Sequence, residues 1–217
     1  QIEQAWAELG PAGSLIAESF VTFSREVSII AVRGQNGDAK TWPLAENHHH
    51  NGILSHSIVP APNSTDLQPV AQDYITRLLN HLNYVGVLTL ELFVTDKGLY
   101  ANEMAPRVHN SGHWSIEGAV CSQFENHIRA VAGLPLGSTA VVRPTVMVNI
   151  IGEHPKSEDV LALEGAHLHL YNKTEREGRK IGHITLMPND AIELTGLCRQ
   201  LAKILPNPLA LTQDMTI

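Results

Sequence analysis

The sequence of 217 residues is poor in cysteine, in net positive charge and in long apolar runs. Its two cysteines, Cys121 and Cys198, both fall in segments that read as helices, which argues against a disulfide framework and favours a cytoplasmic protein with buried thiols. The net charge of −7 opposes nonspecific attraction to nucleic acid, so phosphate binding must come from a local cluster of cations. No apolar run approaches the roughly 18 residues of a membrane span. We therefore expect a small phosphorylated ligand, with neither nucleic acid nor membrane as a partner.

The amino end lacks an initiator methionine and a signal peptide. Gln1 falls inside a helical pattern that runs to Leu9, and we therefore expect the chain to be the carboxyl part of something longer. Residues 10–13 (GPAG) end this helix, and residues 14–21 read as a strand.

The rest of the chain predicts an α+β fold built on an antiparallel sheet. Expected strands cover residues 26–33, 41–44, 53–59, 145–151, 167–171 and 181–187, with a hairpin over 85–103, and expected helices cover 67–82, 115–131, 157–163 and 190–205. The apolar faces of the first two of these helices are expected to be Val70, Tyr74, Leu78 and Leu82, and Ile116, Val120, Phe124 and Ile128. The pattern changes beyond Pro144, which predicts a small second unit there.

The hairpin places two acids on one face of the sheet. A three-residue loop over 96–98 would pair Thr95 with Leu99 and would bring Glu91 opposite Glu103. Carboxylates opposed in this way repel each other unless a cation lies between them. Oxygen ligands favour magnesium or manganese, so the pair is a candidate metal site.

The alternative is that both acids lie on a solvated sheet face. The face of Glu91 also carries Val87, Thr89 and Phe93, which a fully solvated face would not favour. A partly covered acid needs a partner, and a metal would supply one. Asn102, next to the second acid, adds an amide oxygen.

The segment after the hairpin is rich in hydrogen-bond donors that suit an anionic ligand such as a phosphate, a carboxylate or bicarbonate. These donors are Arg107, His109, Asn110, Ser111 and His113. A second donor group consists of Lys173, Arg176, Arg179, Lys180 and His183. The alternatives are a solvated basic turn for the second group and core histidines in the first. Of the three consecutive histidines 48–50, at most one is expected to face a site, because adjacent strand residues point to opposite faces.

Residues 103–113 (EMAPRVHNSGH), residues 178–183 (GRKIGH) and the acidic hairpin resemble the ATP-grasp enzymes and, among them, the N5-carboxyaminoimidazole ribonucleotide synthetases of purine biosynthesis. The resemblance covers nearly the whole chain. It implies an ATP-grasp carboxyl-terminal antiparallel sheet with helices, plus a small carboxyl-terminal α/β unit. Residues 1–22 would be a remnant of the lid and hinge strand, 23–143 the core subdomain and 144–217 the small carboxyl-terminal domain.

The resemblance also implies roles for individual residues. Glu91 and Glu103 would bind Mg²⁺ or Mn²⁺, and the ATP contacts would be Glu18, Ser19, Phe20, Val21, Glu26, His49, Asn102 and Glu103. The catalytic residues would be Arg107, His109 and Lys180, and the substrate contacts would be Asn110, Ser111, His113, Lys173 and Arg179. In such an enzyme ATP phosphorylates bicarbonate, and the carboxyphosphate, or carbon dioxide released from it, carboxylates the amine of aminoimidazole ribonucleotide. The full-length protein would be a homodimer.

The chain departs from this family at its amino end. The family places an amino-terminal domain and a lysine-bearing, glycine-rich lid before the hinge strand, whereas this chain has no lysine before Lys40. We therefore expect the 217 residues alone to have weak or no synthetase activity. The alternatives are another ATP-grasp ligase, such as a formate-using glycinamide ribonucleotide formyltransferase or a biotin carboxylase, and a binding module without catalysis. Residues 109–113 argue against both other ligases by resemblance.

Overall fold

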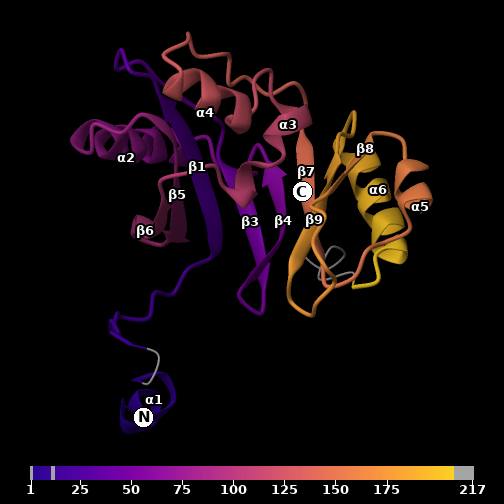
Figure 1. Ribbon diagram of the computed structural model, residues 1–217, viewed down its shortest axis with the longest axis horizontal. Helices are drawn as coiled ribbons and strands as arrows, with labels where there is room; N and C mark the ends of the chain where they lie inside the picture. Colours follow the sequence, from indigo (N-terminus) through magenta and orange to yellow (C-terminus); the bar gives the residue numbers. More distant parts are fainter. Residues whose placement is uncertain (1, 11–12, 208–217) are drawn as a thin grey trace.

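A nine-stranded antiparallel sheet is the frame of the molecule (Figure 1). The structure is a computed structural model that describes residues 2–10 and 13–207. The described strands lie in the order β6-β5-β1-β3-β4-β7-β9-β8, with β2 paired to β1. Their bounds are β1 Arg25–Arg33, β2 Ala39–Thr41, β3 Ala45–His50, β4 Ile53–Val59, β5 Gly86–Thr95, β6 Gly98–Ala105, β7 Thr145–Ile151, β8 Ala166–Leu170 and β9 Lys180–Leu186.

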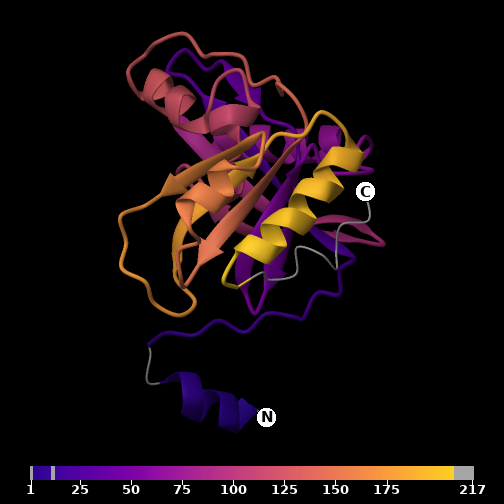
Figure 2. The same ribbon diagram turned by 90° about the vertical axis from the view of Figure 1, so that its right-hand side faces the viewer.

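Helices cover both faces of this sheet. Their bounds are α1 Ile2–Leu9, α2 Leu67–His81, α3 Ser115–Gly118, α4 Gln123–Val131, α5 Ser157–Leu161 and α6 Ala191–Ile204, with a 3-10 turn η2 over Asn110–Gly112. Neighbouring residues of β1 point to opposite faces of the sheet. Ile29 packs with Ile75 of α2, whereas Ile30 packs in the cluster that holds Trp114 and Ala130 of α4. Helices α5 and α6 pack against β7 and β9 (Figure 2).

The predicted turn of the β5–β6 hairpin is wrong by one residue. Thr95 pairs with Gly98, and Val94 pairs with Leu99, so the loop has two residues instead of three. Gly98 has a φ of 115°, a conformation that residues with a side chain rarely adopt.

A bulge restores the predicted register of the two acids. Leu92 pairs with Ala101, but the next pair is Glu91 with Glu103, so Asn102 is the extra residue of the bulge. The shift at the turn and the shift at the bulge cancel. The predicted juxtaposition of Glu91 and Glu103 is therefore confirmed, although the predicted turn is not.

The strand predicted over residues 14–21 is also wrong. Residues 14–23 connect α1 to β1 without regular secondary structure, and in Figure 1 they run outside the sheet. Phe20 is 94% exposed, and none of the described strands pairs with this segment. Because a strand is stabilised by ladder hydrogen bonds and by a buried face, the local sequence alone does not form one. Helix α1 ends at Leu9 as predicted.

The predicted apolar face of α2 is only partly correct: Tyr74 and Leu78 are partly buried against the core, but the fully buried row is the neighbouring one. The helix buries Ala71, Ile75 and Leu79, whereas Val70 and Leu82 are 40% and 47% exposed. The two rows lie next to each other on the helix surface with the same spacing of four residues. Packing against β1 and β5 selects between them, and local sequence does not.

The single helix predicted over 115–131 is two helices. Ala119 forms an isolated bridge with Val141, which interrupts the helix after α3. The Ser122 hydroxyl then accepts a hydrogen bond from the backbone N–H three residues on and begins α4. The expected apolar face is consequently exposed, with Val120 at 62% and Ile128 at 65%.

The other predicted strands and helices agree with the structure to within about two residues, except that the strand expected at 41–44 falls between β2 and β3. The sheet continues across the predicted boundary at Pro144, because β7 pairs with β4 from Thr145 to Val148. The apolar cluster beyond this boundary takes only Ile58 from the earlier part of the chain. The division into units 1–22, 23–143 and 144–217 stays a prediction.

Both cysteines are free and buried, as predicted. Cys198 lies in α6, but Cys121 lies in the break between α3 and α4 rather than in a helix. Burial raises the pKa of the Cys198 thiol to about 12. None of the helices in the described residues combines the length and apolar character needed to cross a bilayer.

Candidate active site

Glu91 on β5 and Glu103 on β6 are the centre of the candidate site. They are direct cross-strand partners, and the Glu91 side chain is only 16% exposed. Burial raises the pKa of Glu91; the positive potential of His49 and Lys180 opposes this rise, and the charges of Glu103 and Glu26 add to it. The acid pair is thus a site of unbalanced negative charge.

The acid pair fits a divalent cation that binds oxygen. Opposed carboxylates lose their repulsion when a cation lies between them, and both ligands are the hard oxygen donors that Mg²⁺ and Mn²⁺ prefer. Asn102 at the bulge is next to Glu103 in the chain and carries a further oxygen. Within the described residues, no group of three or more His, Cys, Asp or Glu side chains could hold a metal. The two acids therefore fit a metal that takes further oxygens from a ligand or from water.

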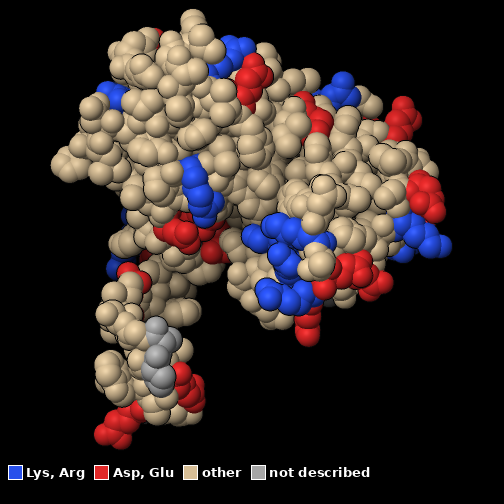
Figure 3. Space-filling model, in the orientation of Figure 1, with Lys and Arg blue, Asp and Glu red and all other residues tan. Residues whose placement is uncertain are grey.

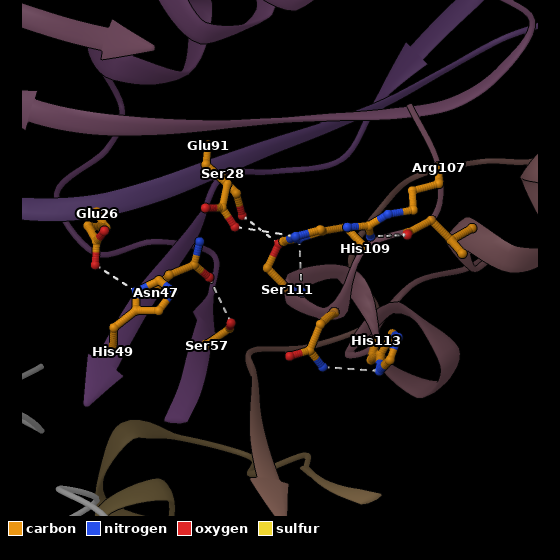
Figure 4. A network of polar contacts seen from close by, with 12 residues as sticks. Glu26, Ser28, Asn47, His49, Ser57, Glu91, Arg107, His109, Ser111 and His113 are labelled. Atoms are coloured by element: carbon orange, nitrogen blue, oxygen red, sulfur yellow. Dashed lines mark hydrogen bonds and ion pairs between the residues drawn. The ribbon is translucent and has the colours of Figure 1, made fainter. Parts of the chain in front are cut away.

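His109 lies beside Glu91 and is held on its other side by two serines (Figure 4). Its Nε2 is 3.4 Å from Glu91 Oε1. Its Nδ1 accepts the backbone N–H of Ser111 at 3.3 Å and is 2.8 Å from the Ser111 hydroxyl, which in turn accepts a hydrogen bond from Ser28 at 2.9 Å. A ring nitrogen that accepts a backbone N–H carries no proton, so the proton is on Nε2 and faces Glu91.

Burial lowers the pKa of His109 to about 4, with smaller contributions from Arg107, Lys180 and His49. The ring is therefore neutral at neutral pH and presents an N–H donor. Ser111 is fully buried, and its hydroxyl has two partners. A direct substrate contact by Ser111 would require its hydroxyl to leave them, so its position favours a role in holding His109.

Lys180, the first residue of β9, reaches the same face of the molecule. Its Nζ donates to Asn110 Oδ1 at 3.0 Å. Asn110 and Asn149 exchange amide hydrogen bonds of 2.9 and 2.8 Å, and Asn149 also donates to the carbonyl of Leu54 at 2.9 Å. Burial lowers the pKa of Lys180, and the carboxylate of Glu91 opposes this change. The Asn110–Asn149 amide pair thus fixes the position of the Lys180 charge.

Arg107 and Lys173 add positive charge around Lys180. Both act to lower the pKa of Lys180, so sequence positions 107, 173 and 180 are brought together. Acidic and basic atoms gather on either side of a hollow near the middle of this face (Figure 3).

The remaining predicted substrate residues lie beside this group. Lys173 Nζ lies 5.1 Å from the centre of the Tyr171 ring, and Arg179 donates to Thr174 Oγ1 at 3.0 Å in the loop between β8 and β9. His113 Nδ1 is 3.3 Å from Asn110 Nδ2.

The predicted nucleotide contacts divide into two groups. Glu26 Oε2 and His49 Nδ1 are 2.6 Å apart on β1 and β3, and both act on the pKa of Glu91 (Figure 4). Residues 18–21, in contrast, lie in the irregular segment before β1. Of the three consecutive histidines, His49 acts on the acid pair, whereas His48 stacks on His56 with ring centres 4.3 Å apart.

Sequence reasoning missed three polar residues of this site. Ser28, Asn149 and Tyr171 each contact a predicted site residue or its partner. The signal for the first two was a polar residue inside an apolar strand, since a buried polar group needs a partner. No local signal indicated Tyr171, because its partners lie on other elements.

Two family models match this chain. The ATP-grasp domain matches residues 1–124, which include β1 to β6 and the loop with His109. The phosphoribosylaminoimidazole carboxylase C-terminal domain matches residues 145–195, which include β7 to β9 and Lys180.

Individual relatives agree with both matches. The N5-carboxyaminoimidazole ribonucleotide synthase of Vibrio parahaemolyticus is 49% identical over 211 residues, covering 94% of this chain and 55% of the relative. The N5-carboxyaminoimidazole ribonucleotide synthetase structure from Thermus thermophilus superimposes with a TM-score of 0.90 at 52% identity, covering 95% of this chain and 58% of that one. An Aspergillus clavatus N5-carboxyaminoimidazole synthase, solved in complex with ADP and 5-aminoimidazole ribonucleotide, superimposes with a TM-score of 0.77 at 30% identity, covering 85% of this chain and 53% of that one.

The chain spans just over half the length of these relatives, at 53–58%. Their similarity confirms the predicted α+β fold with an ATP-grasp antiparallel sheet. Because the ATP-grasp model matches more than half of its residues, this chain belongs to the ATP-grasp family.

Proposed function

We propose that this chain is part of a carbon–nitrogen ligase that uses ATP and bicarbonate to convert 5-aminoimidazole ribonucleotide into N5-carboxyaminoimidazole ribonucleotide in purine biosynthesis. The observation that carries the proposal is the convergence of the acid pair, His109 and Lys180 on one face. The named synthases that match nearly the whole chain support it, as does a relative solved with ADP and 5-aminoimidazole ribonucleotide.

The proposed reaction has two steps. A bicarbonate oxygen attacks the γ-phosphorus of ATP, the bond to ADP breaks, and carboxyphosphate forms. The amine nitrogen of the ribonucleotide then attacks the carboxyl carbon, or that of carbon dioxide released from carboxyphosphate. Phosphate leaves, and the amine loses a proton. Both steps gather negative charge on oxygen, so the protein needs to supply cations and N–H donors.

The acid pair serves the first step in this proposal. Glu91 and Glu103, with Asn102 beside them, would hold Mg²⁺ or Mn²⁺ at the site of the nucleotide phosphates. A bound metal neutralises the charge that develops on the phosphoryl oxygens. Glu26 and His49 contact the nucleotide, and residues 18–21 contact its base. The hydrogen bond between Glu26 and His49, 2.6 Å long, keeps both side chains at the edge of the acid pair.

The cations serve the bicarbonate and the ribonucleotide. Arg107 and Lys180 stabilise the anionic carboxyl and phosphoryl oxygens. His109 contributes its Nε2–H as a donor, because its Nδ1 is occupied and its pKa is lowered to about 4. Lys173 and Arg179, in the β8–β9 loop, bind the ribonucleotide phosphate.

The polar residues between these cations complete the substrate site. Asn110 and His113 line it, and Ser111 contributes by holding His109.

Calorimetry on the 217-residue chain tests the proposal. With Mg²⁺ and ADP present, the chain is expected to bind 5-aminoimidazole ribonucleotide, and Lys180→Met is expected to weaken that binding at least about tenfold through loss of a charge-assisted contact. Lys156→Met is the matched control, because Lys156 is exposed at the start of α5, and it is expected to bind as the parent does.

The alternatives give different results in the same experiment. Binding of glycinamide ribonucleotide in place of aminoimidazole ribonucleotide would indicate a formyltransferase-type ligase. A folded chain that binds neither ribonucleotide nor Mg²⁺–ADP would overturn the proposal in favour of a module without catalysis.

Three further proposals accompany this function. The isolated chain has weak or no synthetase activity, which an assay of ADP release tests. The full-length protein is a homodimer, which sedimentation analysis tests. The protein acts in the cytoplasm, which cell fractionation tests.

A further inference from the structure

The Tyr171 side chain lies between His113, which lines the proposed substrate site, and His183, which has no part in the proposed function. Its hydroxyl is 2.9 Å from His113 Nδ1 and 2.7 Å from His183 Nδ1. His183 is 2% exposed, and its ring centre lies 5.0 Å from that of His113. We call these three residues the Tyr171 bridge. It joins the loop after β6 to strand β9.

At its His113 end, the bridge contacts the side-chain amide of Asn110, which holds Lys180. An ammonium group can only donate, so the Asn110 atom that receives Lys180 at 3.0 Å is the carbonyl oxygen. The Asn110 amide nitrogen consequently faces Asn149 Oδ1 at 2.9 Å and His113 Nδ1 at 3.3 Å.

This orientation determines the direction of each hydrogen bond in the bridge. His113 Nδ1 receives the N–H of Asn110 and therefore carries no proton. The Tyr171 O–H donates to the same nitrogen, so the Tyr171 oxygen is free to accept the Nδ1–H of His183. His183 Nε2 is then left as a bare acceptor, in agreement with its lack of a hydrogen-bond partner in the described part of the chain. Burial lowers the pKa of His113 to about 4 and that of His183 to about 3, so both rings are neutral as this pattern requires.

Rigid elements support the bridge on both sides. His183 pairs with Asn149 across β9 and β7, and Asn149 is anchored to the carbonyl of Leu54. The ring of His169 stacks on His183 with centres 4.3 Å apart, and its Nε2 is 2.6 Å from Glu117 Oε1. The supports come from β4, β7, β8 and α3.

We propose that Tyr171 is a positioning residue for Lys180: its hydroxyl fixes His113 as an acceptor, His113 holds the Asn110 amide, and the amide holds the lysine charge where the anionic substrate binds. The last link rests on the proposed function. Tyr171 itself touches neither the acid pair nor, in this proposal, the reacting atoms.

The test is Tyr171→Phe in the 217-residue chain, which removes one hydroxyl and keeps the ring. Nitrogen NMR of the histidine rings is expected to show His113 exchanging between tautomers, and the Asn110 side-chain amide signal is expected to shift. In the presence of Mg²⁺ and ADP, the dissociation constant for 5-aminoimidazole ribonucleotide is expected to rise about tenfold, with ADP binding unchanged within about twofold. Tyr100→Phe is the control, because Tyr100 is 45% exposed on β6, and it is expected to change none of these readouts.

A double variant separates positioning from stability. Tyr171→Phe with His183→Phe removes the N–H that the single variant leaves without an acceptor, so stability is expected to recover while ribonucleotide affinity stays low. Recovery of affinity with stability would overturn the proposal, as would an unchanged His113 tautomer in Tyr171→Phe. If the parent chain binds no ribonucleotide, the proposed function fails, and the tautomer and Asn110 signals alone decide the bridge.

Discussion

Acidification from about pH 7.5 to about pH 5.5 is expected to lower the free energy of unfolding by about 5.5 kcal/mol, because four buried histidines resist protonation. His56 is fully buried on β4, and its pKa is lowered from 6.5 to about 3. Burial likewise lowers the pKa values of His109 and His113 to about 4 and that of His183 to about 3. In each case the loss of solvent around the charged form is the largest cause.

The sign and size follow from proton linkage. Between the folded and unfolded pKa values the unfolded chain binds more protons, so stability rises with pH across this window and is lost as pH falls below about 6.5. Each ring loses about 1.4 kcal/mol over one pH unit below its unfolded pKa, and four rings give the total of about 5.5 kcal/mol. The raised pKa of Glu91 acts in the opposite direction, and the lowered pKa of Glu46 acts only below its ordinary value of 4.5.

His56 offers a direct check of this magnitude. Besides burial, the charge of His48 lowers its pKa and that of Glu46 raises it. His56→Phe keeps an aromatic ring for the stack on His48 but removes the titrating group, so its stability should fall by only about 4 kcal/mol over the same pH range.

Urea unfolding followed by tryptophan fluorescence measures the effect, since Trp42 and Trp114 are each 1% exposed in the folded state. The control is His81→Gln on the exposed surface of α2, which should leave the pH dependence of the parent unchanged. A parent curve that is flat over this range, or a His56→Phe curve as steep as the parent's, would refute the reasoning.

Three further predictions concern the metal site, a helix cap and a close contact. Glu103→Gln should weaken Mn²⁺ binding in calorimetry about tenfold or more, whereas Glu153→Gln, at an exposed acid, should not; equal losses would contradict the assigned site. Ser122→Ala should lower the urea-unfolding free energy by about 1 kcal/mol through loss of the α4 N-cap. An unchanged unfolding midpoint would show that the cap does not stabilise the protein. Gly112→Ala should cost about 1–3 kcal/mol in the same unfolding assay, because its added Cβ would collide with the Ile30 side chain of β1, whereas Gly196→Ala in α6, with no atom within 4 Å, should be neutral or stabilising.

The acid pair shows how much local sequence can predict. The strand pattern around Glu91 placed both carboxylates on one face, and this result survived an error in the turn because the bulge at Asn102 compensated for it. Local sequence could not predict the bulge, since it depends on how β6 lies against β5 and on the loop that follows. The correct pairing of Glu91 with Glu103 therefore resulted from two local errors that cancelled, namely the turn length and the missing bulge.

The irregular segment and the helices show where local sequence fails. Residues 14–21 are predicted as a strand but have no described partner, and the predicted apolar rows of α2 and of residues 115–131 face solvent at Val70, Val120 and Ile128. Periodicity states which residues share a side of an element. It does not state which side is covered.

The sequence by itself determined most of the strands and helices and the chemical types at the site, because strand alternation and side-chain charge are properties of residues near one another in the chain. Only the tertiary structure decided which polar groups meet. Ser28 reaches Ser111 across 83 positions and Tyr171 reaches His113 across 58, and such pairs depend on the order of strands in the sheet. A hydrogen bond requires two atoms within about 3 Å of each other, and only the assembled sheet brings them to that distance.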